Sequence, residues 1–181
     1  MKRVFGGPVF SVVSGMTREP GGVRARRDIV RHSGSVAVLP VQPDGGLTLI
    51  RQYRCAFAKQ MIELPAGRID KGETPLQAAK RELREEVGFG ARRWERLLRI
   101  VPTPGFCDET VTIYRASDLF PSALEPDPDE RIEVLSLSLT QGLARLTAGK
   151  IEDAKTAIAL LLEERRRRHL PLPAKGRGAS D

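Results

Sequence analysis

The stretch from residue 74 to residue 88, "TPLQAAKRELREEVG", constrains the fold most, because it carries start and stop signals of one helix. Thr74 suits the N-cap, Pro75 suits the first helical position, and Gln77 completes a capping box. Gly88 supplies a left-handed stop. Apolar residues recur at helical spacing inside the segment: Leu76, Ala79, Leu83 and Val87. The segment therefore predicts a helix with one face against a core.

Three carboxylates gather on the other side of this helix. At about 100° per residue, Glu82, Glu85 and Glu86 fall within an arc of about 100° away from the apolar stripe. Like charges four residues apart weaken a helix, and a divalent cation removes that cost because Mg²⁺ and Mn²⁺ prefer carboxylate oxygens. The alternative is a solvated face on which Arg81 and Arg84 neutralise the acids.

The surrounding pattern favours the metal site. The stretch "GRIDKGETPLQAAKRELREEVGF" has fixed residue types at seven positions, which chance would supply at roughly 10⁻⁸ per start position. It resembles the Nudix box at every fixed position: Gly67, Glu73, Arg81, Glu82, Glu85, Glu86 and Gly88. The resemblance implies a loop–helix–loop that holds divalent metals against a diphosphate.

The same resemblance assigns roles to residues. It implies that Glu82, Glu85 and Glu86 bind Mg²⁺, with Mn²⁺ able to substitute, and that the carbonyl of Ala66 is a further ligand. It implies that Glu73 and Arg81 form a supporting ion pair beside Gly67.

Looser motifs point to one subgroup. "RQYR", "IELPAGRID", "PGF" and "GKIEDAKTAIALLL" resemble segments of ADP-ribose pyrophosphatases and related hydrolases of nucleoside-diphosphate sugars. Arginine binds phosphate through its planar fork, so Arg54 is the first candidate for substrate binding, with Arg51 and Arg68 behind it. Gly105 and Phe106 of "PGF" are further candidates.

The base that activates water is predicted from a loop that departs from the relatives' pattern. The subgroup usually carries this glutamate on an acidic loop after the box. In "EPDPDERIEV", Pro128 takes one of the two expected positions and Glu130 takes the other, so Glu130 is the first candidate. Glu109 in "PGFCDE" is the second, and the alternative for both is a solvated loop acid.

Composition narrows the class of protein. The chain of 181 residues has a net charge of +7, but most of the excess lies in residues 165–181, so we expect no nucleic-acid partner. The longest apolar run, "AIALLL", is too short for a membrane span. The two cysteines predict no disulfide framework, and together these features predict a soluble cytoplasmic protein.

The rest of the chain reads as alternating strands and turns that end in two helices. We expect a mixed α/β Nudix fold, with a mixed β-sheet sandwiched between helices and an antiparallel N-terminal β arm. The predicted division is an arm at 1–32, a Nudix domain at 33–164 and a basic tail at 165–181. The subgroup commonly dimerises through such an arm, so we expect a homodimer.

The leading functional hypothesis is Mg²⁺-dependent cleavage of ADP-ribose to AMP and ribose 5-phosphate. Hydrolysis of another nucleoside-diphosphate sugar, such as ADP-glucose or GDP-mannose, remains open. A Nudix-fold sensor that binds such ligands without turnover is disfavoured by the complete box, and an RNA-associated protein would rely on the basic tail.

Overall fold

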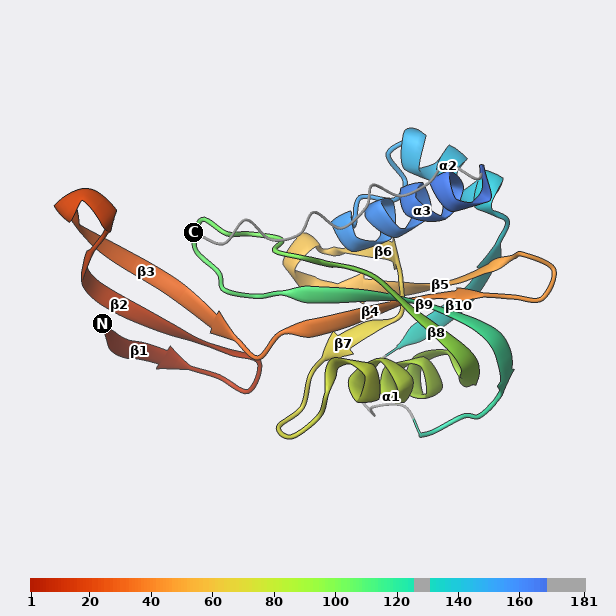
Figure 1. Cartoon of the computed structure of the whole chain (residues 1–181), viewed down its shortest axis with the longest axis horizontal. Coiled ribbons are helices and arrows are strands. Elements are labelled where there is room, and N and C mark those ends of the chain that lie inside the picture. The colour runs from red at the N-terminus through yellow and green to blue at the C-terminus, as the bar shows by residue number, and fades with distance from the viewer. Residues whose placement is uncertain (126–130, 169–181) are drawn as a thin grey trace.

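A computed structural model describes residues 1–125 and 131–168 and shows a β arm standing apart from a layered core (Figure 1). The arm is an antiparallel sheet in the order β1-β2-β3. The predicted antiparallel arm is confirmed: β2 and β3 form a hairpin, and its turn holds Gly21 and Gly22 at φ of 77° and 82°, which glycine adopts without strain. An additional strand, β1, pairs with its outer edge. The arm comprises β1 (Lys2–Gly6), β2 (Phe10–Arg18), the turn η1 (Pro20–Gly22) and β3 (Arg24–His32).

The core is a mixed sheet in the order β10-β5-β4-β9-β8, with β6 paired to β5 and β7 paired to β4. The β4–β9 pair is parallel and the other pairs are antiparallel. The mixed sheet expected from the sequence is present, and it includes a short strand, β7, that the sequence did not predict. The strands are β4 (Ser35–Val41), β5 (Leu47–Arg54), β6 (Lys59–Glu63), β7 (Ala66–Arg68), β8 (Phe89–Ile100), β9 (Val111–Pro121) and β10 (Ile132–Leu137), with a turn η2 (Cys55–Phe57) after β5.

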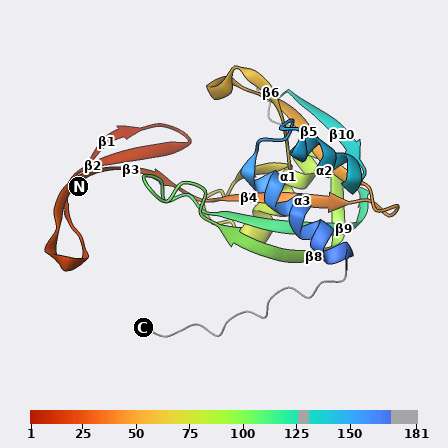
Figure 2. The same ribbon diagram turned by 90° about the horizontal axis from the view of Figure 1, so that it is seen from above.

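Helices cover both faces of this sheet. The helix α1 (Pro75–Val87) lies against one face, and α2 (Leu139–Thr147) and α3 (Ala154–Arg167) lie on the other (Figures 1 and 2). The predicted capping box of α1 is present, and Gly88 ends the helix at φ 75° and ψ 16°. Ser138 and Gln141 form a second capping box at α2, and Asp153 caps α3. The mixed α/β sandwich expected from the sequence is thus confirmed.

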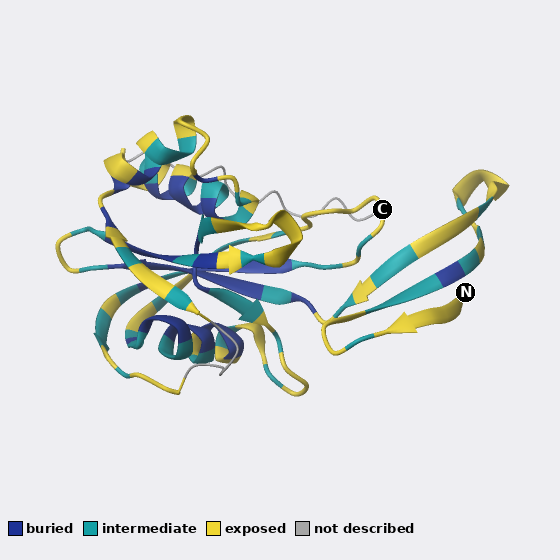
Figure 3. Ribbon diagram, turned by 180° about the vertical axis from the view of Figure 1, so that it is seen from behind, coloured by how far each residue is buried: buried dark blue, intermediate teal, exposed yellow. Residues whose placement is uncertain are grey.

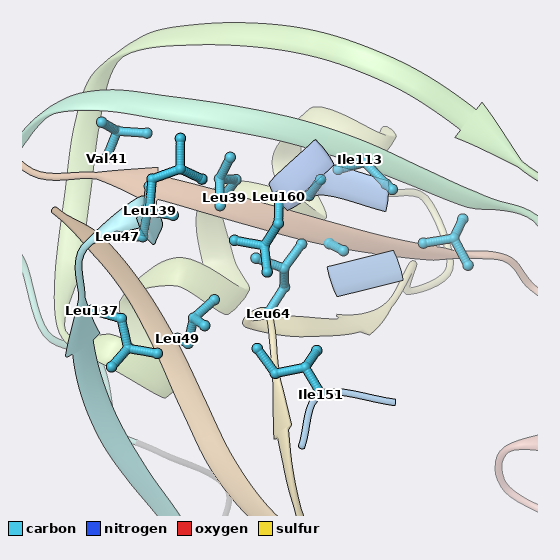
Figure 4. Packing of buried hydrophobic residues seen from close by; sticks show 13 residues of the cluster. Leu39, Val41, Leu47, Leu49, Leu64, Ile113, Leu137, Leu139, Ile151 and Leu160 are labelled. Carbon is cyan, nitrogen blue, oxygen red and sulfur yellow. The ribbon is translucent and has the colours of Figure 1, made fainter. Parts of the chain in front are cut away.

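Alternating side chains of the central strand β4 supply two cores. Ala37, Leu39 and Val41 join the cluster under α2 and α3, whose larger members are shown in Figure 4. Val36 and Val38 join the cluster under α1. Burial is concentrated in these central strands, while the arm is mostly exposed or half-buried (Figure 3). The core therefore holds β4, β7 and α1 in a fixed relation.

The helix α3 carries the first residues of the predicted basic tail. The helix begins after the cap Asp153 and continues through Arg167, so the first arginines of the basic segment are helical. Arg167 contacts the buried carboxylate of Glu163 at 2.9 Å and donates to the carbonyl of Gly45. Residues 169–181 lie outside the described part of the chain. Among the described residues, no helix is long and apolar enough to cross a membrane.

Candidate functional site

The acidic face of α1 rests on the backbone of β7, which lies beside it (Figure 1). Glu86 accepts a hydrogen bond from the backbone N–H of Ala66 at 2.8 Å. Glu82 packs on Gly67 so closely that a Cβ at position 67 would lie 1.9 Å from its Oε1. Both carboxylates are buried, at 8% and 7% exposure. Two glutamates one turn apart therefore converge on the same two backbone residues, and only glycine fits at the second.

Arg81 organises the acidic face. Its Nη1 donates to Glu82 Oε1 and Glu85 Oε2, both at 2.8 Å. Its Nε and Nη2 donate to the carboxylate of Glu73 at 3.0 and 3.1 Å, and Nη2 also reaches the carbonyl of Arg68. One guanidinium thus ties the helix to the loop before it.

Glu73 and Arg81 each stabilise the charged form of the other. Hydrogen bonds from Arg81 hold the pKa of the Glu73 carboxyl below its usual range, and Glu73 is the main cause of the raised pKa of Arg81. The Glu73–Arg81 ion pair that the Nudix resemblance implies is therefore present, and Gly67 lies next to it in the chain.

The donor chemistry of this face fits a hard divalent cation, because buried carboxylates and a nearby strand carbonyl are oxygen ligands of the kind Mg²⁺ takes. The geometry in residues 1–125 and 131–168 does not yet bring three acidic, histidine or cysteine side chains together as a ligand group. Arg81 Nη1 lies between Glu82 and Glu85, so a cation held by both would compete with its hydrogen bonds. The metal ligand set remains a prediction.

A cavity of about 270 Å³ opens beside β7 and brings several predicted residues together. Among those predicted from the sequence, Arg54, Arg68, Ala66, Gly67 and Glu109 line it. The residues that sequence reasoning did not single out are Ser35, Val36, Ile100, Pro102, Val111, Asp153, Ala154 and Lys155. The cavity thus joins the candidate phosphate-binding arginines to the box.

Arg54 is held by a buried carboxylate at the end of β6. Its Nε and Nη2 donate to Glu63 Oε1 and Oε2 at 2.7 and 3.0 Å, and Lys155 Nζ donates to the same Oε2 at 2.6 Å. Burial raises the pKa of Glu63, but these two cations outweigh burial and lower it overall. The hydrogen bond to Glu63 is the main cause of the raised pKa of Arg54.

Glu109 is the candidate base that the structure describes. Its Oε1 accepts a hydrogen bond from Ser35 Oγ at 2.6 Å, and Nδ1 of His32 lies 3.9 Å from the same oxygen. The other candidate, Glu130, lies outside the described residues, so its role stays a prediction.

Three other candidates lie away from this cavity. Arg51 pairs with Glu133 of the neighbouring strand β10 at 2.7 Å. Phe106 is 57% exposed, and its carbonyl accepts a hydrogen bond from the N–H of Val30 in the arm. Gly105 is exposed in the same loop. The structure therefore connects the "PGF" loop to the arm, and the substrate roles of these residues remain predictions.

Sequence reasoning missed Glu63 and Lys155, although a signal existed for each. Glu63 interrupts the apolar strand "MIEL", and a buried acid in a strand needs a cationic partner. Lys155 is in the first turn of α3, where the helix dipole disfavours a cation. Both residues violate a local rule, and violations of this kind cluster at functional sites.

Comparison with known proteins decides the family. The NUDIX domain model matches residues 31–160, which is most of the chain and includes the box helix with its glutamates. The chain belongs to the Nudix family. The Nudix match begins at the last residues of the arm and ends inside α3.

Individual relatives match most of the chain. An ADP-ribose pyrophosphatase of Bacillus subtilis is 36% identical over 163 residues, covering 88% of this chain and 87% of the relative. A methanol dehydrogenase activator of Bacillus methanolicus is 35% identical and covers 88% and 87%. The crystal structure of an ADP compounds hydrolase matches with a TM-score of 0.79 at 30% identity and covers 94% of both chains.

Proposed function

We propose that this Nudix protein hydrolyses the diphosphate of ADP-ribose and releases AMP and ribose 5-phosphate. The observation that carries the proposal is the convergence of Glu82 and Glu86 on the Ala66–Gly67 backbone at the edge of a cavity lined by Arg54 and Arg68. The likeness to an ADP-ribose pyrophosphatase over most of the chain supports the choice of substrate.

Diphosphate cleavage demands little covalent chemistry from a protein and relies on positioning and charge. In our proposal Glu82, Glu85, Glu86 and the carbonyl of Ala66 hold Mg²⁺. When bound, such a cation neutralises phosphate charge and lowers the pKa of a bound water. Within the chain, Arg81 fixes the acidic face by bonding Glu73 on its other edge, and Gly67 leaves room for Glu82.

Arg54 and Arg68 supply the chain's own anion contacts. Among the described residues Glu63 engages Nε and Nη2 of Arg54, which leaves the Nη1 edge for a phosphate. Arg68 donates from Nη1 to the carbonyl of Pro8, which links the connection between β1 and β2 to the cavity. Both guanidiniums can donate hydrogen bonds to phosphate oxygens in place of solvent.

The proton acceptor in this account is a glutamate outside the box. Glu109 lines the cavity, and Ser35 fixes one of its oxygens, so its carboxylate is placed to take a proton from water after a small loop movement. Glu130 keeps the first place given by the sequence pattern. The rates of Glu109→Gln and Glu130→Gln across pH separate the two candidates. Only substitution of the true base should remove the acidic limb of the pH–rate profile.

We further propose that the enzyme is a cytoplasmic homodimer assembled through the arm. Apolar arm residues are exposed in the single chain: Val4 is 61%, Phe5 50% and Met16 56% exposed. This exposure supports an arm that packs on a partner. Cys55 and Cys107 are both free thiols, which fits a reducing compartment.

A substrate panel tests the function. Purified protein with Mg²⁺ is assayed for kcat/KM on ADP-ribose, ADP-glucose and GDP-mannose, with phosphate-containing products separated by chromatography. We expect ADP-ribose to lead by about 10-fold or more, the scale of one good polar contact. A higher value for another nucleoside-diphosphate sugar would move the assignment to that substrate. Binding without turnover of any of them would indicate a sensor.

A further inference from the structure

The buried carboxylate of Glu63 links two cations that come from distant parts of the chain. Arg54 ends β5 and Lys155 lies in the first turn of α3, and both contact this one side chain. Glu63 is 3% exposed, so it needs its partners to avoid the cost of a bare buried charge. The guanidinium and the ammonium thereby share one carboxylate, and both donate to its Oε2.

Lys155 is itself held by a second carboxylate. Its Nζ donates to Asp153 Oδ1 at 2.8 Å, and its side chain is 17% exposed. Asp153 and Glu63 together raise the pKa of Lys155 in spite of burial, so the ammonium stays charged. Glu63 consequently has a second, lasting positive charge at the Oε2 that it also offers to Arg54.

The joint between α3 and β6 does not depend on Lys155. Thr156 Oγ1 accepts a hydrogen bond from the N–H of Leu64 at 2.8 Å and donates to Asp153 Oδ2. Asp153 also caps the helix through the N–H of Thr156. Thr156 and Asp153 therefore join α3 to β6 without Lys155, which leaves Lys155 available for another role.

The role of Lys155 follows from how Glu63 would behave without it. Without Lys155, Glu63 would keep one cation instead of two, and its Oε2 would lose its shortest hydrogen bond. Water entering the cavity would then compete for hydrogen bonds with the Arg54 guanidinium. An arginine at about one third exposure keeps a fixed direction only if its partner is fixed. The direction matters because the remaining Nη1 edge is the one a phosphate would meet.

We propose that Lys155 is a positioning residue that acts through Glu63 to fix the phosphate-binding direction of Arg54. This inference rests on the proposed diphosphate hydrolysis, and it adds a residue of α3 to a site otherwise built from β5, β7 and α1. It places the helix α3 in the catalytic apparatus.

A double-mutant cycle tests the inference. Lys155→Met, Arg54→Met and the double variant are compared with the wild type for kcat, KM and melting temperature. We expect Lys155→Met to lower kcat/KM by about 10- to 100-fold, the scale of a lost charge-assisted contact. In the Arg54→Met background, Lys155→Met should change kcat/KM by no more than about 3-fold, because its target is gone.

Lys59→Met is the matched control. Lys59 pairs with Glu152 just before α3 but does not line the cavity, and it is exposed. Its removal should leave kcat/KM within about 2-fold. Lys155→Ala, which also removes the contact with Glu63, replaces Lys155→Met in the cycle if the methionine variant does not fold.

The outcomes separate this inference from the proposed function. If the two substitutions multiply their effects, or if Lys155→Met behaves like Lys59→Met, Lys155 does not act through Arg54 and the inference is wrong. If the wild type cleaves another nucleoside-diphosphate sugar but not ADP-ribose, the proposed substrate is wrong. The cycle is then measured on the substrate that is turned over, with the same criteria.

Discussion

Substituting Gly67 by alanine should remove activity while leaving the fold. A Cβ at this position would lie 1.9 Å from Oε1 and 2.1 Å from Cδ of Glu82, whereas real Cβ contacts stay beyond 3.0 Å. The carboxylate must therefore move by roughly 1 Å, and a misplacement of about 1 Å can cost about 10²-fold in rate. We expect kcat of Gly67→Ala to fall by about 10²-fold at saturating Mg²⁺.

The stability of the same variant should change little. The clash falls on the end of a flexible side chain, and Gly→Ala also stabilises by about 0.4–1 kcal/mol through the unfolded state. Loss of the Arg81–Glu82 contact opposes this, so the net loss of unfolding free energy should be about 2 kcal/mol or less. Chemical denaturation measures it.

Gly46→Ala is the control for this experiment. Its added Cβ would lie 3.0 Å from Asp44 Oδ1, on a hairpin turn away from the cavity. Its kcat should match the wild type. A Gly67→Ala enzyme with full kcat would refute the reasoning, since Glu82 would then not need its observed place.

Other expectations follow from the same site. Glu82→Gln and Glu86→Gln should each keep the fold and lower turnover by about 10²-fold, measured at saturating Mg²⁺; wild-type rates would exclude the metal role. Glu73→Gln should melt below the wild type at pH 7, and the difference should vanish as pH falls below about 4.5, because Arg81 lowers the Glu73 pKa and the ion pair is lost on protonation. A difference that persists at low pH would contradict this. Light scattering should show a homodimer that dissociates when residues 1–31 are deleted; a fully active monomeric wild type would overturn the arm's role.

The sequence predicted much of the fold because its signals are local. The caps at Thr74 and Gly88 fix α1, and the nearly continuous apolar run of residues 35–41 fits a central strand with two buried faces. The short β7 was missed because its pairing with β4 depends on residues far along the chain. Three residues carry too little local pattern to be recognised as a strand.

The site was less predictable, because its ion pairs join distant segments. Arg54 could be chosen as an anion contact from its residue type, but its partner Glu63 and the second cation Lys155 come together only in the folded chain. Arg51 carries the same residue type and lies elsewhere, paired with Glu133. Side-chain direction along a strand separates the two arginines, and residue type alone does not.

The most direct test of the account is a product measurement on ADP-ribose. Protein stripped of metal is given ADP-ribose with and without Mg²⁺, and AMP and ribose 5-phosphate are quantified over time beside the Glu82→Gln and Glu86→Gln variants. We expect equal amounts of the two products, formed only when the cation is added and about 10²-fold more slowly in either variant. Equal rates with and without Mg²⁺, or cleavage of ADP-ribose at another bond, would contradict it.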